Sequence, residues 1–440
     1  MPVHSGTRGK GHLYVMDRTI LHCDMNSFFA SVEIARRPEL ARVPMAVCGS
    51  IEERHGIILA KNQLAKPYGI ETGEPVVQAK RKCPRLVTVE ADYDEYIKFS
   101  REARKIYDGY TDLVEPLGID ECWLDVTGSR RLFGDGLTIA ETLRERIKRE
   151  LGVTVSIGVS FNKVFAKLGS DMKKPDAVTC IPRESFRQMI WGLPVSDLFG
   201  VGRATAEKLR GCGIVTIGQL ANAYPPMIKY RLGVNGLRLI AAAVGRDETP
   251  VLPGDAVIEA KSVSRGTTTR RDMETPDDVR TVMFALCEDI GHKLLLCRQK
   301  ACGVAVYARD NSLSHFQYQA RLPEPTDSYS VIAKAAFELF MRKHSFSLPL
   351  RSVTVGATEL CRDTVPQQTS FFTDSQSVYR SEILDRTMDG INRRFGSTAA
   401  TFPGLRRQSG LRKRGKAPLR VRGGEREAIP QRGQKTGRRL

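Results

Sequence analysis

Residues 19–35 read TILHCDMNSFFASVEIA and hold the pattern on which the fold depends. Residues 19–24 form a short apolar run, which predicts a buried strand. Asn26 or Ser27 can cap the helix predicted by the FFASVEIA segment that follows. Asp24 therefore ends a buried strand at a strand-to-helix turn, where a charge is costly unless it is paired or binds a metal ion.

Two further carboxylates lie in another apolar stretch, LVEPLGIDECWLDVTG at 113–128. The stretch predicts strand, turn and strand, with Asp120 and Glu121 near the turn. Because neighbouring strand residues point to opposite faces, both can serve one site only where the backbone bends or bulges. With Asp24 they would form hard oxygen ligands suited to Mg²⁺, and two such ions about 3.5–4 Å apart support in-line phosphoryl displacement. The alternative is an ordinary pair of turn residues.

Around these carboxylates, strands alternate with helices and an apparent hairpin is included. Strands are expected at 44–48, 56–60 and 154–159, and helices at 62–68, 74–82, 94–111, 138–151 and from 162 onward. The expected fold class is α+β and multidomain, with an antiparallel or mixed palm-like sheet and helices on one face.

The second half of the chain predicts two other regions. Residues 183–245 have a helical pattern with glycine-marked turns, and PVLPG at 250–254 predicts a linker. Residues 258–360 predict the order βαββαβ, which is a compact domain of its own. A last helix is expected at 378–395.

The charge of the chain is unevenly distributed. The net charge is +18 over 440 residues, and residues 405–440, with 13 Lys or Arg and two Glu, carry +11 of it. A basic balance favours nucleic acid as a partner, and an anionic membrane second. The basic tail is expected to be disordered, and the sequence leaves open whether it binds anything or is only a solvated extension.

Other classes of protein are disfavoured by the composition. The ten cysteines form no CxxC pair and the seven histidines are scattered, so neither zinc nor a disulfide framework is expected. No apolar run reaches the roughly 18 residues of a membrane span, and no secretory signal is visible, so the expected location is the cytoplasm. A near match to a phosphate-binding loop at 410–417 lacks the hydroxyl residue, so no ATPase is expected.

Five blocks, taken in order, resemble the Y-family DNA polymerases, and most of all the DNA polymerase IV type. The resemblance runs from about residue 19 to 396, and the fourth block is the longest and most specific. The blocks are HCDMNSFFASVE at 22–33, ILAKNQLAKPYGI at 58–70, GIDECWLDVTGS at 118–129, SIGVSFNKVFAKLGSDMKKPD at 156–176 and LFGVGRATAEKLRGCGI at 198–214.

The resemblance implies roles for the carboxylates and their neighbours. Asp24, Asp120 and Glu121 match the metal-binding set, and Glu121 is usually counted as the catalytic residue. Met25 would lend its backbone carbonyl to one of two Mg²⁺ ions. Asn26 stands where the family often has Asp, at a position that is not a metal ligand in the pattern.

The resemblance also implies the nucleotide contacts. Phe28 and Phe29 open the helix after Asp24, so their amides can contact triphosphate oxygens. Phe29 matches the steric gate that leaves no room for a ribose 2′-hydroxyl; without the resemblance, a core aromatic on an amphipathic helix is the favoured interpretation. Lys174 matches a triphosphate-binding lysine. Gln63 and Lys66 stand where the family often has Tyr and Arg, which puts the affinity for the nucleotide in doubt.

Candidate DNA contacts lie in two regions. Gly200 and Gly202 flank a turn between helical runs, which resembles a helix-hairpin-helix that grips the duplex backbone, although a plain tight turn is the alternative. In the region resembling the little finger, a polar and basic strand could follow a DNA backbone or be a solvated sheet face. Its basic residues are Lys261, Arg265, Arg270 and Arg271.

The segment QQTSFF resembles the short motif that docks these polymerases on the sliding clamp. Gln368 would anchor the segment, and Phe371 and Phe372 would fill a pocket. Thr369 replaces the usual apolar residue. The alternative is that the two aromatic rings pack onto the chain's own domain.

The expected organisation follows from these regions. In order, it comprises a flexible extension (1–17), palm (18–37), fingers (38–90), palm (91–182), thumb (183–249), linker (250–257), little finger (258–364), clamp-binding-like motif with a C-terminal helix (365–404), and a basic tail (405–440).

The expected function is template-directed, error-prone DNA synthesis past damaged bases, without proofreading. Its partners would be primer–template DNA, dNTPs and the sliding clamp, with no membrane, and the chain is expected to be a monomer. Two alternatives stay open. One is a polymerase V-type catalytic subunit that needs accessory proteins, and the other is a catalytically inactive DNA- and clamp-binding homologue.

Overall fold

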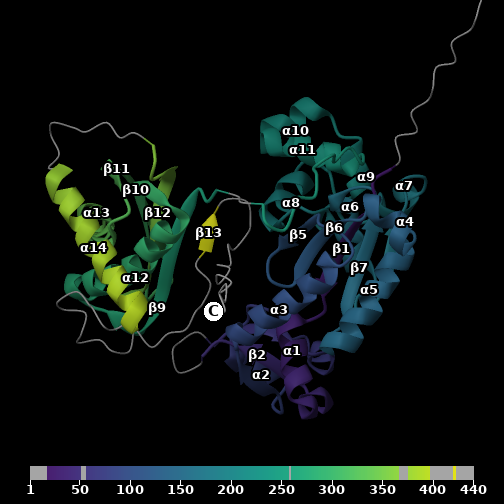
Figure 1. The fold of residues 1–440 in the computed structure, drawn as a ribbon, viewed down its shortest axis with the longest axis horizontal. Coiled ribbons are helices and arrows are strands. Elements are labelled where there is room, and N and C mark those ends of the chain that lie inside the picture. Colours follow the sequence, from purple (N-terminus) through teal and green to yellow (C-terminus); the bar gives the residue numbers. More distant parts are fainter. Residues whose placement is uncertain (1–16, 51–55, 257–258, 366–374, 397–419, 423–440) are drawn as a thin grey trace, which may run out of the picture. The chain divides into compact units, whose positions relative to one another are not determined.

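The computed structural model describes residues 17–50, 56–256, 259–365, 375–396 and 420–422. The chain divides into two compact units, and Figure 1 labels their helices and strands. The first comprises Met1–Ala35 and Ile97–Asp255, and the second comprises Arg36–Tyr96 and Ala256–Leu440.

The first unit is built on a five-stranded sheet in the order β5-β6-β1-β7-β8. Its central strand, β1, is antiparallel to both neighbours and buried throughout, as its apolar sequence predicts. The β7–β8 pair is parallel, so the sheet is mixed. The strands are β1 (Ile20–Met25), β5 (Val114–Leu117), β6 (Glu121–Asp125), β7 (Val155–Ser160) and β8 (Val178–Ile181).

Helix α6 (Lys163–Met172) packs closely on β1 and β7. Asn162 caps it by accepting a hydrogen bond from the Phe165 amide at 2.8 Å. Gly158 permits the close approach, because a Cβ atom there would lie 1.9 Å from the Ala166 carbonyl oxygen. The other helical elements that lie wholly or mostly within the first unit, up to residue 151, are α1 (Phe28–Arg36), α3 (Tyr93–Asp108), η3 (Thr127–Ser129), α4 (Arg130–Phe133) and α5 (Gly136–Leu151).

Residues 183–245 are mainly helical, as predicted, with an isolated bridge between Pro194 and Thr216. They have an apolar core that includes Leu209, Ile217 and Leu220. The elements are α7 (Phe186–Ile190), η4 (Val195–Asp197), α8 (Arg203–Arg210), α9 (Ile217–Ala221), α10 (Pro225–Leu232) and α11 (Val234–Ala243).

The first residues of the predicted linker are packed against the sheet of the first unit. Val251 is buried in a cluster with Ile20 and Trp123. The Leu252 amide donates a 2.7 Å hydrogen bond to a Glu115 carboxylate oxygen. The start of this segment is therefore fixed to the first unit.

The second unit contains a small sheet in the order β3-β2-β4, with its own apolar core. Its elements are η1 (Pro38–Arg42), β2 (Met45–Cys48), β3 (Ile58–Lys61), η2 (Gln63–Tyr68), α2 (Val76–Lys82) and β4 (Val87–Glu90).

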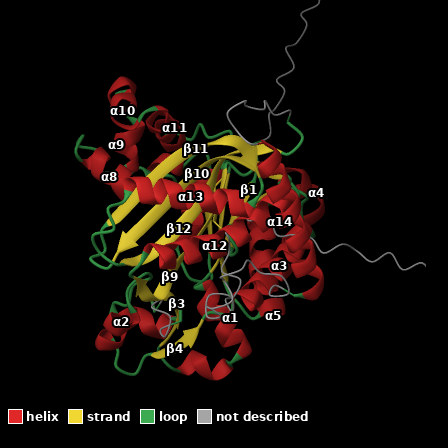
Figure 2. Cartoon of the chain, turned by 90° about the vertical axis from the view of Figure 1, so that its left-hand side faces the viewer, coloured by secondary structure: helices red, strands yellow, loops and turns green. Residues whose placement is uncertain are grey.

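A larger sheet of the second unit has the order β11-β10-β12-β9-β13, and α12 and α13 lie across its strands (Figure 2). The predicted βαββαβ order is confirmed by β9 (Ser262–Met273), α12 (Pro276–Cys297), β10 (Gln299–Asp310), β11 (His315–Thr326), α13 (Tyr329–Lys343) and β12 (Leu350–Arg362). The expectation of a disordered tail is wrong for β13 (Arg420–Arg422), which pairs with β9. Edge strands offer their backbone groups to such segments.

Helix α14 (Ser375–Phe395) is held to this domain by buried polar groups. Glu382 is paired with Lys300 at 2.9 Å and accepts a hydrogen bond from Thr326 at 3.0 Å. Asp385 accepts bonds from the Ser328 and Ser330 hydroxyls at 2.6 and 2.9 Å. The predicted last helix is therefore present and anchored. None of the described helices is both long and apolar enough to cross a bilayer.

Candidate active site

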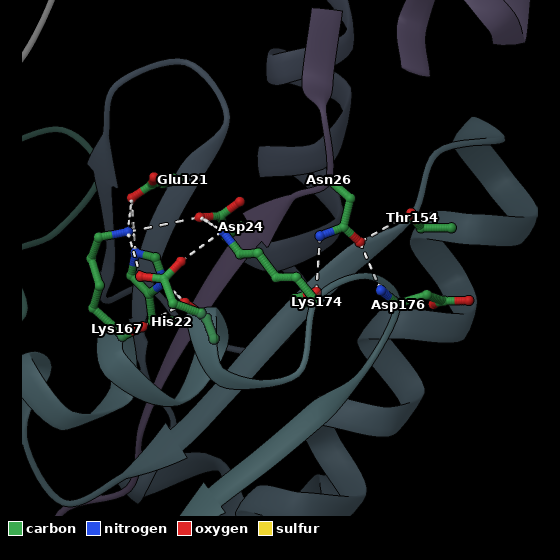
Figure 3. Close-up of polar contacts among 11 residues, drawn as sticks. His22, Asp24, Asn26, Glu121, Thr154, Lys167, Lys174 and Asp176 are labelled. Atoms are coloured by element: carbon green, nitrogen blue, oxygen red, sulfur yellow. Dashed lines mark hydrogen bonds and ion pairs between the residues drawn. The ribbon is translucent and has the colours of Figure 1, made fainter. Parts of the chain in front are cut away.

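Asp24 and Glu121 face each other at the ends of β1 and β6. They are paired residues in the antiparallel register, so their side chains project from the same face of the sheet. Asp24 is 6% exposed and the Glu121 side chain is 21% exposed. The structure therefore brings together two of the three predicted carboxylates (Figure 3).

Asp120 is the last residue of the turn between β5 and β6, directly before Glu121. Its carbonyl accepts a 3.1 Å hydrogen bond from the Met25 amide, which ties the turn to the end of β1. Burial raises the pKa of Asp120 to about 7, and the neighbouring charges of Glu121 and Asp24 add to the effect. A backbone bend was required by the sequence for Asp120 and Glu121 to serve one site, and this turn is that bend. It brings the Asp120 carboxyl group close to those of Asp24 and Glu121 in the chain's fold.

Two lysines of the fourth motif balance this charge. Lys174 places its Nζ 2.6 Å from Asp24 Oδ2. Lys167, on α6, lies 2.7 Å from Glu121 Oε2 and 3.7 Å from Asp24 Oδ2. Burial still raises the pKa of Asp24 above its ordinary value, against the opposing effect of Lys174. The carboxylates therefore attract cations, and in this structure the ammonium groups of the two lysines neutralise them.

These contacts test whether a divalent cation fits the site. The described residues contain no ready-made group of three or more His, Cys, Asp and Glu side chains arranged to hold a metal ion. However, Asp24 and Glu121 supply oxygen atoms to one shared cation, the Lys167 ammonium, and Asp120 follows in the adjoining turn. This hard-oxygen donor set is the kind that Mg²⁺ prefers. The residues therefore fit a divalent cation in place of the ammonium.

His22 is a site residue that the sequence analysis missed. It is fully buried, its Nδ1 lies 2.8 Å from Ser170 Oγ, and its Nε2 lies 3.2 Å from Glu121 Oε2. Burial lowers the pKa of His22 to about 3, so the ring is neutral. Its signal in the sequence was its place two residues before Asp24, on the same face of the strand.

Asn26 joins three segments around the nucleotide-binding candidate Lys174. Its amide nitrogen donates to Ser156 Oγ at 2.9 Å, and its Oδ1 accepts bonds from Thr154 Oγ1 at 3.0 Å and from the Asp176 amide at 2.8 Å (Figure 3). From the sequence, Asn26 was considered only as a candidate helix cap and as a position that is not a metal ligand. The structure makes it the link between β7 and the loop that carries Lys174.

The two phenylalanines at the start of α1 differ in burial. Phe28 is 3% exposed and belongs to the core, whereas Phe29 is partly exposed. Their ring centroids are 5.8 Å apart. Both amides lie at the N-terminus of α1, which is separated from the end of β1 by two residues. This arrangement agrees with a core role for the Phe28 ring, and it leaves part of the Phe29 side chain at the surface.

Comparison with known proteins shows which family this chain resembles. The chain matches the impB/mucB/samB family over residues 23–171 and the C-terminal domain of that family over residues 260–371. It is 49% identical to DNA polymerase IV of Acetivibrio thermocellus over 381 residues, which cover 87% of this chain and 96% of that one. It is 35% identical to DNA polymerase IV 1 of Bacillus subtilis, covering 86% and 91%.

The chain belongs to the Y-family DNA polymerases, of the DNA polymerase IV type. The predicted function, that of a DNA-directed DNA polymerase of translesion synthesis, is thereby confirmed. A solved structure, the Y-family DNA polymerase chimera Dbh-Dpo4(243-245)-Dbh, matches with a TM-score of 0.70 and 21% identity, covering 78% of this chain and 99% of that one. The right-hand fold with palm, fingers, thumb and little finger is also confirmed.

The other predicted nucleotide residues of this Y-family chain, Gln63 and Lys66, lie in the region predicted to form the fingers. Gln63 and Lys66 are exposed and three residues apart on η2, which Asn62 caps by accepting a 3.0 Å hydrogen bond from the Ala65 amide. They belong to the second compact unit, and their contact with a nucleotide stays a prediction.

In the thumb, the predicted DNA-binding turn lies between η4 and α8. Gly200 has φ +92°, a left-handed conformation that favours glycine. Gly202 is the N-cap residue of α8. The element before the turn is a single 3₁₀ turn and not the full helix of the predicted helix-hairpin-helix.

The basic residues of the little finger are placed differently from one another. Lys261 directly precedes β9 and is exposed, and Arg270 is exposed within the strand. The Arg265 side chain is only 16% exposed and lies 2.9 Å from Asp289 of α12. Arg265 is therefore engaged within the domain. The clamp-binding candidates Gln368, Phe371 and Phe372 lie outside the described residues.

Proposed function

We propose that Asp24, Asp120 and Glu121 hold two Mg²⁺ ions, with Met25 as a backbone-carbonyl ligand, and that this centre joins a dNTP to a primer 3′ end. The observation that carries the proposal is the cross-strand pair of Asp24 and Glu121, which shares one ammonium cation. Bound Mg²⁺ would activate the 3′-hydroxyl and stabilise the leaving pyrophosphate.

The chain's own residues supply binding and orientation. Lys174 would turn from Asp24 to the triphosphate, where its charge offsets the phosphate oxygens. The Phe28 and Phe29 amides at the start of α1 would add helix-terminus contacts to the same oxygens. Gln63 and Lys66 would contact the triphosphate from the fingers. The partly exposed Phe29 ring would lie under the sugar and exclude a 2′-hydroxyl.

The DNA would be held without reading its sequence. Gly200 and Gly202 would bring the thumb backbone close to DNA phosphates. Lys261 and Arg270 would contact the phosphates along one DNA strand, and Arg265, which is paired with Asp289, would contribute less. The segment QQTSFF would dock a monomeric enzyme on the sliding clamp. Its work on chromosomal DNA would take place in the cytoplasm.

Primer extension tests the proposal. The purified full chain, with Mg²⁺ and dNTPs, is expected to extend a primer on undamaged and damaged templates, whereas Asp120→Ala/Glu121→Ala is expected to be inactive. Exposed Glu141, on α5, provides the control Glu141→Gln. Extension by the double variant would contradict the proposed site. DNA binding without extension by the wild-type chain would favour an accessory-dependent or inactive homologue.

A further inference from the structure

Lys167 has a place in the site that the proposed roles leave unused. Its ammonium touches Glu121 at 2.7 Å, and lies 3.7 Å from both Asp24 and Asp171. The side chain is 16% exposed, compared with 31% for Lys174. Lys167 is thus the more enclosed of the two lysines, and it alone bridges the cross-strand pair.

The backbone of Lys167 is firmly held. Its carbonyl accepts a 2.7 Å hydrogen bond from Ser170 Oγ, which is also in contact with His22. Helix α6 is fixed against the sheet by the close approach at Gly158. Any adjustment at this position is therefore made by the flexible four-carbon side chain and not by the helix.

The ammonium and a divalent cation would use the same oxygen atoms. Glu121 Oε2 accepts a hydrogen bond from Lys167, and Asp24 Oδ2 lies 3.7 Å from the same ammonium as an ion pair. The proposed function gives both carboxylates to Mg²⁺. Two cations cannot share these atoms without strong repulsion at such short range. Asp171, four residues farther along α6 and 45% exposed, offers the ammonium another acceptor through Oδ2, while its Oδ1 lies 2.7 Å from Lys174.

We propose that Lys167 is a resident counter-cation of the Asp24–Glu121 pair and that it moves to Asp171 when a divalent cation binds. The inference rests on the proposed metal site. In the protein without DNA, Lys167 stabilises the paired carboxylates and competes with divalent cations. Loading of the metal site then depends on the negative charge that the primer and the triphosphate bring.

The test measures Mn²⁺ binding to the full chain without DNA, by electron paramagnetic resonance of the free ion. Lys167→Gln removes the competing charge, so it is expected to bind Mn²⁺ at least about tenfold more tightly than wild type. Lys173→Gln removes a charge from an exposed residue next to the end of the same helix and is expected to behave as wild type. Lys167→Gln/Glu121→Gln is expected to lose the gain.

A second measurement covers the case in which Lys167→Gln folds poorly. Asp171→Asn removes the alternative acceptor, so it is expected to weaken Mn²⁺ binding in the complex with primer–template and dNTP by about tenfold. Mn²⁺ affinity of Lys167→Gln equal to or below that of wild type would overturn the inference. If primer extension still required Glu121, the proposed function would stand even though the inference about Lys167 had failed. If neither wild type nor Lys167→Gln bound Mn²⁺ and the wild-type chain did not extend a primer, both the inference and the proposed function would be wrong.

Discussion

Asp24 and Glu121 occupy opposite positions in the β1–β6 register, and the Lys167 ammonium links their carboxylates. The pair is built by two segments far apart in the sequence, whereas Asp120 enters through a turn. The arrangement places three carboxyl groups in a partly buried position, where their charge is energetically costly. Such clusters of charged groups are common at functional sites.

The difference between Phe28 and Phe29 gives a direct prediction. Phe29→Ala is expected to raise ribonucleotide insertion relative to deoxynucleotide insertion by about a hundredfold, because the ring no longer excludes the 2′-hydroxyl. Phe28→Ala makes the same change in size at a core residue, so it is expected to cost about 3–5 kcal/mol of stability and leave sugar selection unchanged. Insertion assays with paired nucleotides and thermal melts distinguish the two. Unchanged sugar selection in Phe29→Ala would show that Phe29 is not the steric gate.

The raised pKa of Asp120 predicts a pH effect on the metal-free chain. The folded pKa of about 7 exceeds the ordinary value of 3.8, so the folded state binds the proton more tightly than the unfolded state. This contribution to stability is fully present below about pH 3.8 and is lost as the pH rises through 7. Asp120→Asn is expected to reduce the loss of stability between pH 5 and 8. Melting temperatures with a chelator measure it, and parallel pH curves for the two proteins would contradict the assignment.

The hydrogen bonds of Asn26 predict which substitutions are tolerated. Asn26→Leu breaks the bonds to Thr154, Ser156 and the Asp176 amide, so the loop of Lys174 loses its support. The KM for dNTP is expected to rise about tenfold. Asn26→Asp keeps the acceptor and can receive the Ser156 hydroxyl, so it serves as the matched control. Steady-state insertion kinetics provide the measurement, and an unchanged KM in a folded Asn26→Leu protein would argue against this role.

The buried pair of Lys300 and Glu382 predicts how α14 is held. Lys300→Met leaves a buried carboxylate without its main partner, a change that typically costs about 3–5 kcal/mol. Hydrogen exchange of α14 is therefore expected to accelerate strongly. Lys300→Met/Glu382→Leu removes both charges and should restore much of the protection. Equal exchange in the single variant and the wild type would show that the pair does not anchor the helix.

Much of this architecture could be predicted from the sequence because the patterns are local. The apolar run before Asp24 and the strand–turn–strand around Asp120 and Glu121 identified the centre of the palm. The same reasoning identified the βαββαβ order of the little finger. Lys174 was identified only through the resemblance to a known family.

The contacts that the sequence did not reveal depend on packing between distant segments. Lys167 reaches Glu121 because Gly158 lets α6 approach the sheet, and no sequence period encodes that approach. The hydrogen bonds of Asn26 join residues more than a hundred positions apart. The pairing of Arg265 with Asp289 likewise depends on the position of α12 over β9.

The most direct test of the metal site is the single-turnover rate of dNTP insertion by Glu121→Gln, bound to primer–template DNA with saturating Mg²⁺. Gln keeps the size of the side chain but removes its charge. We predict that insertion slows by at least about a hundredfold while DNA affinity is retained. A rate equal to that of the wild-type chain would contradict the assignment of Glu121 to catalysis.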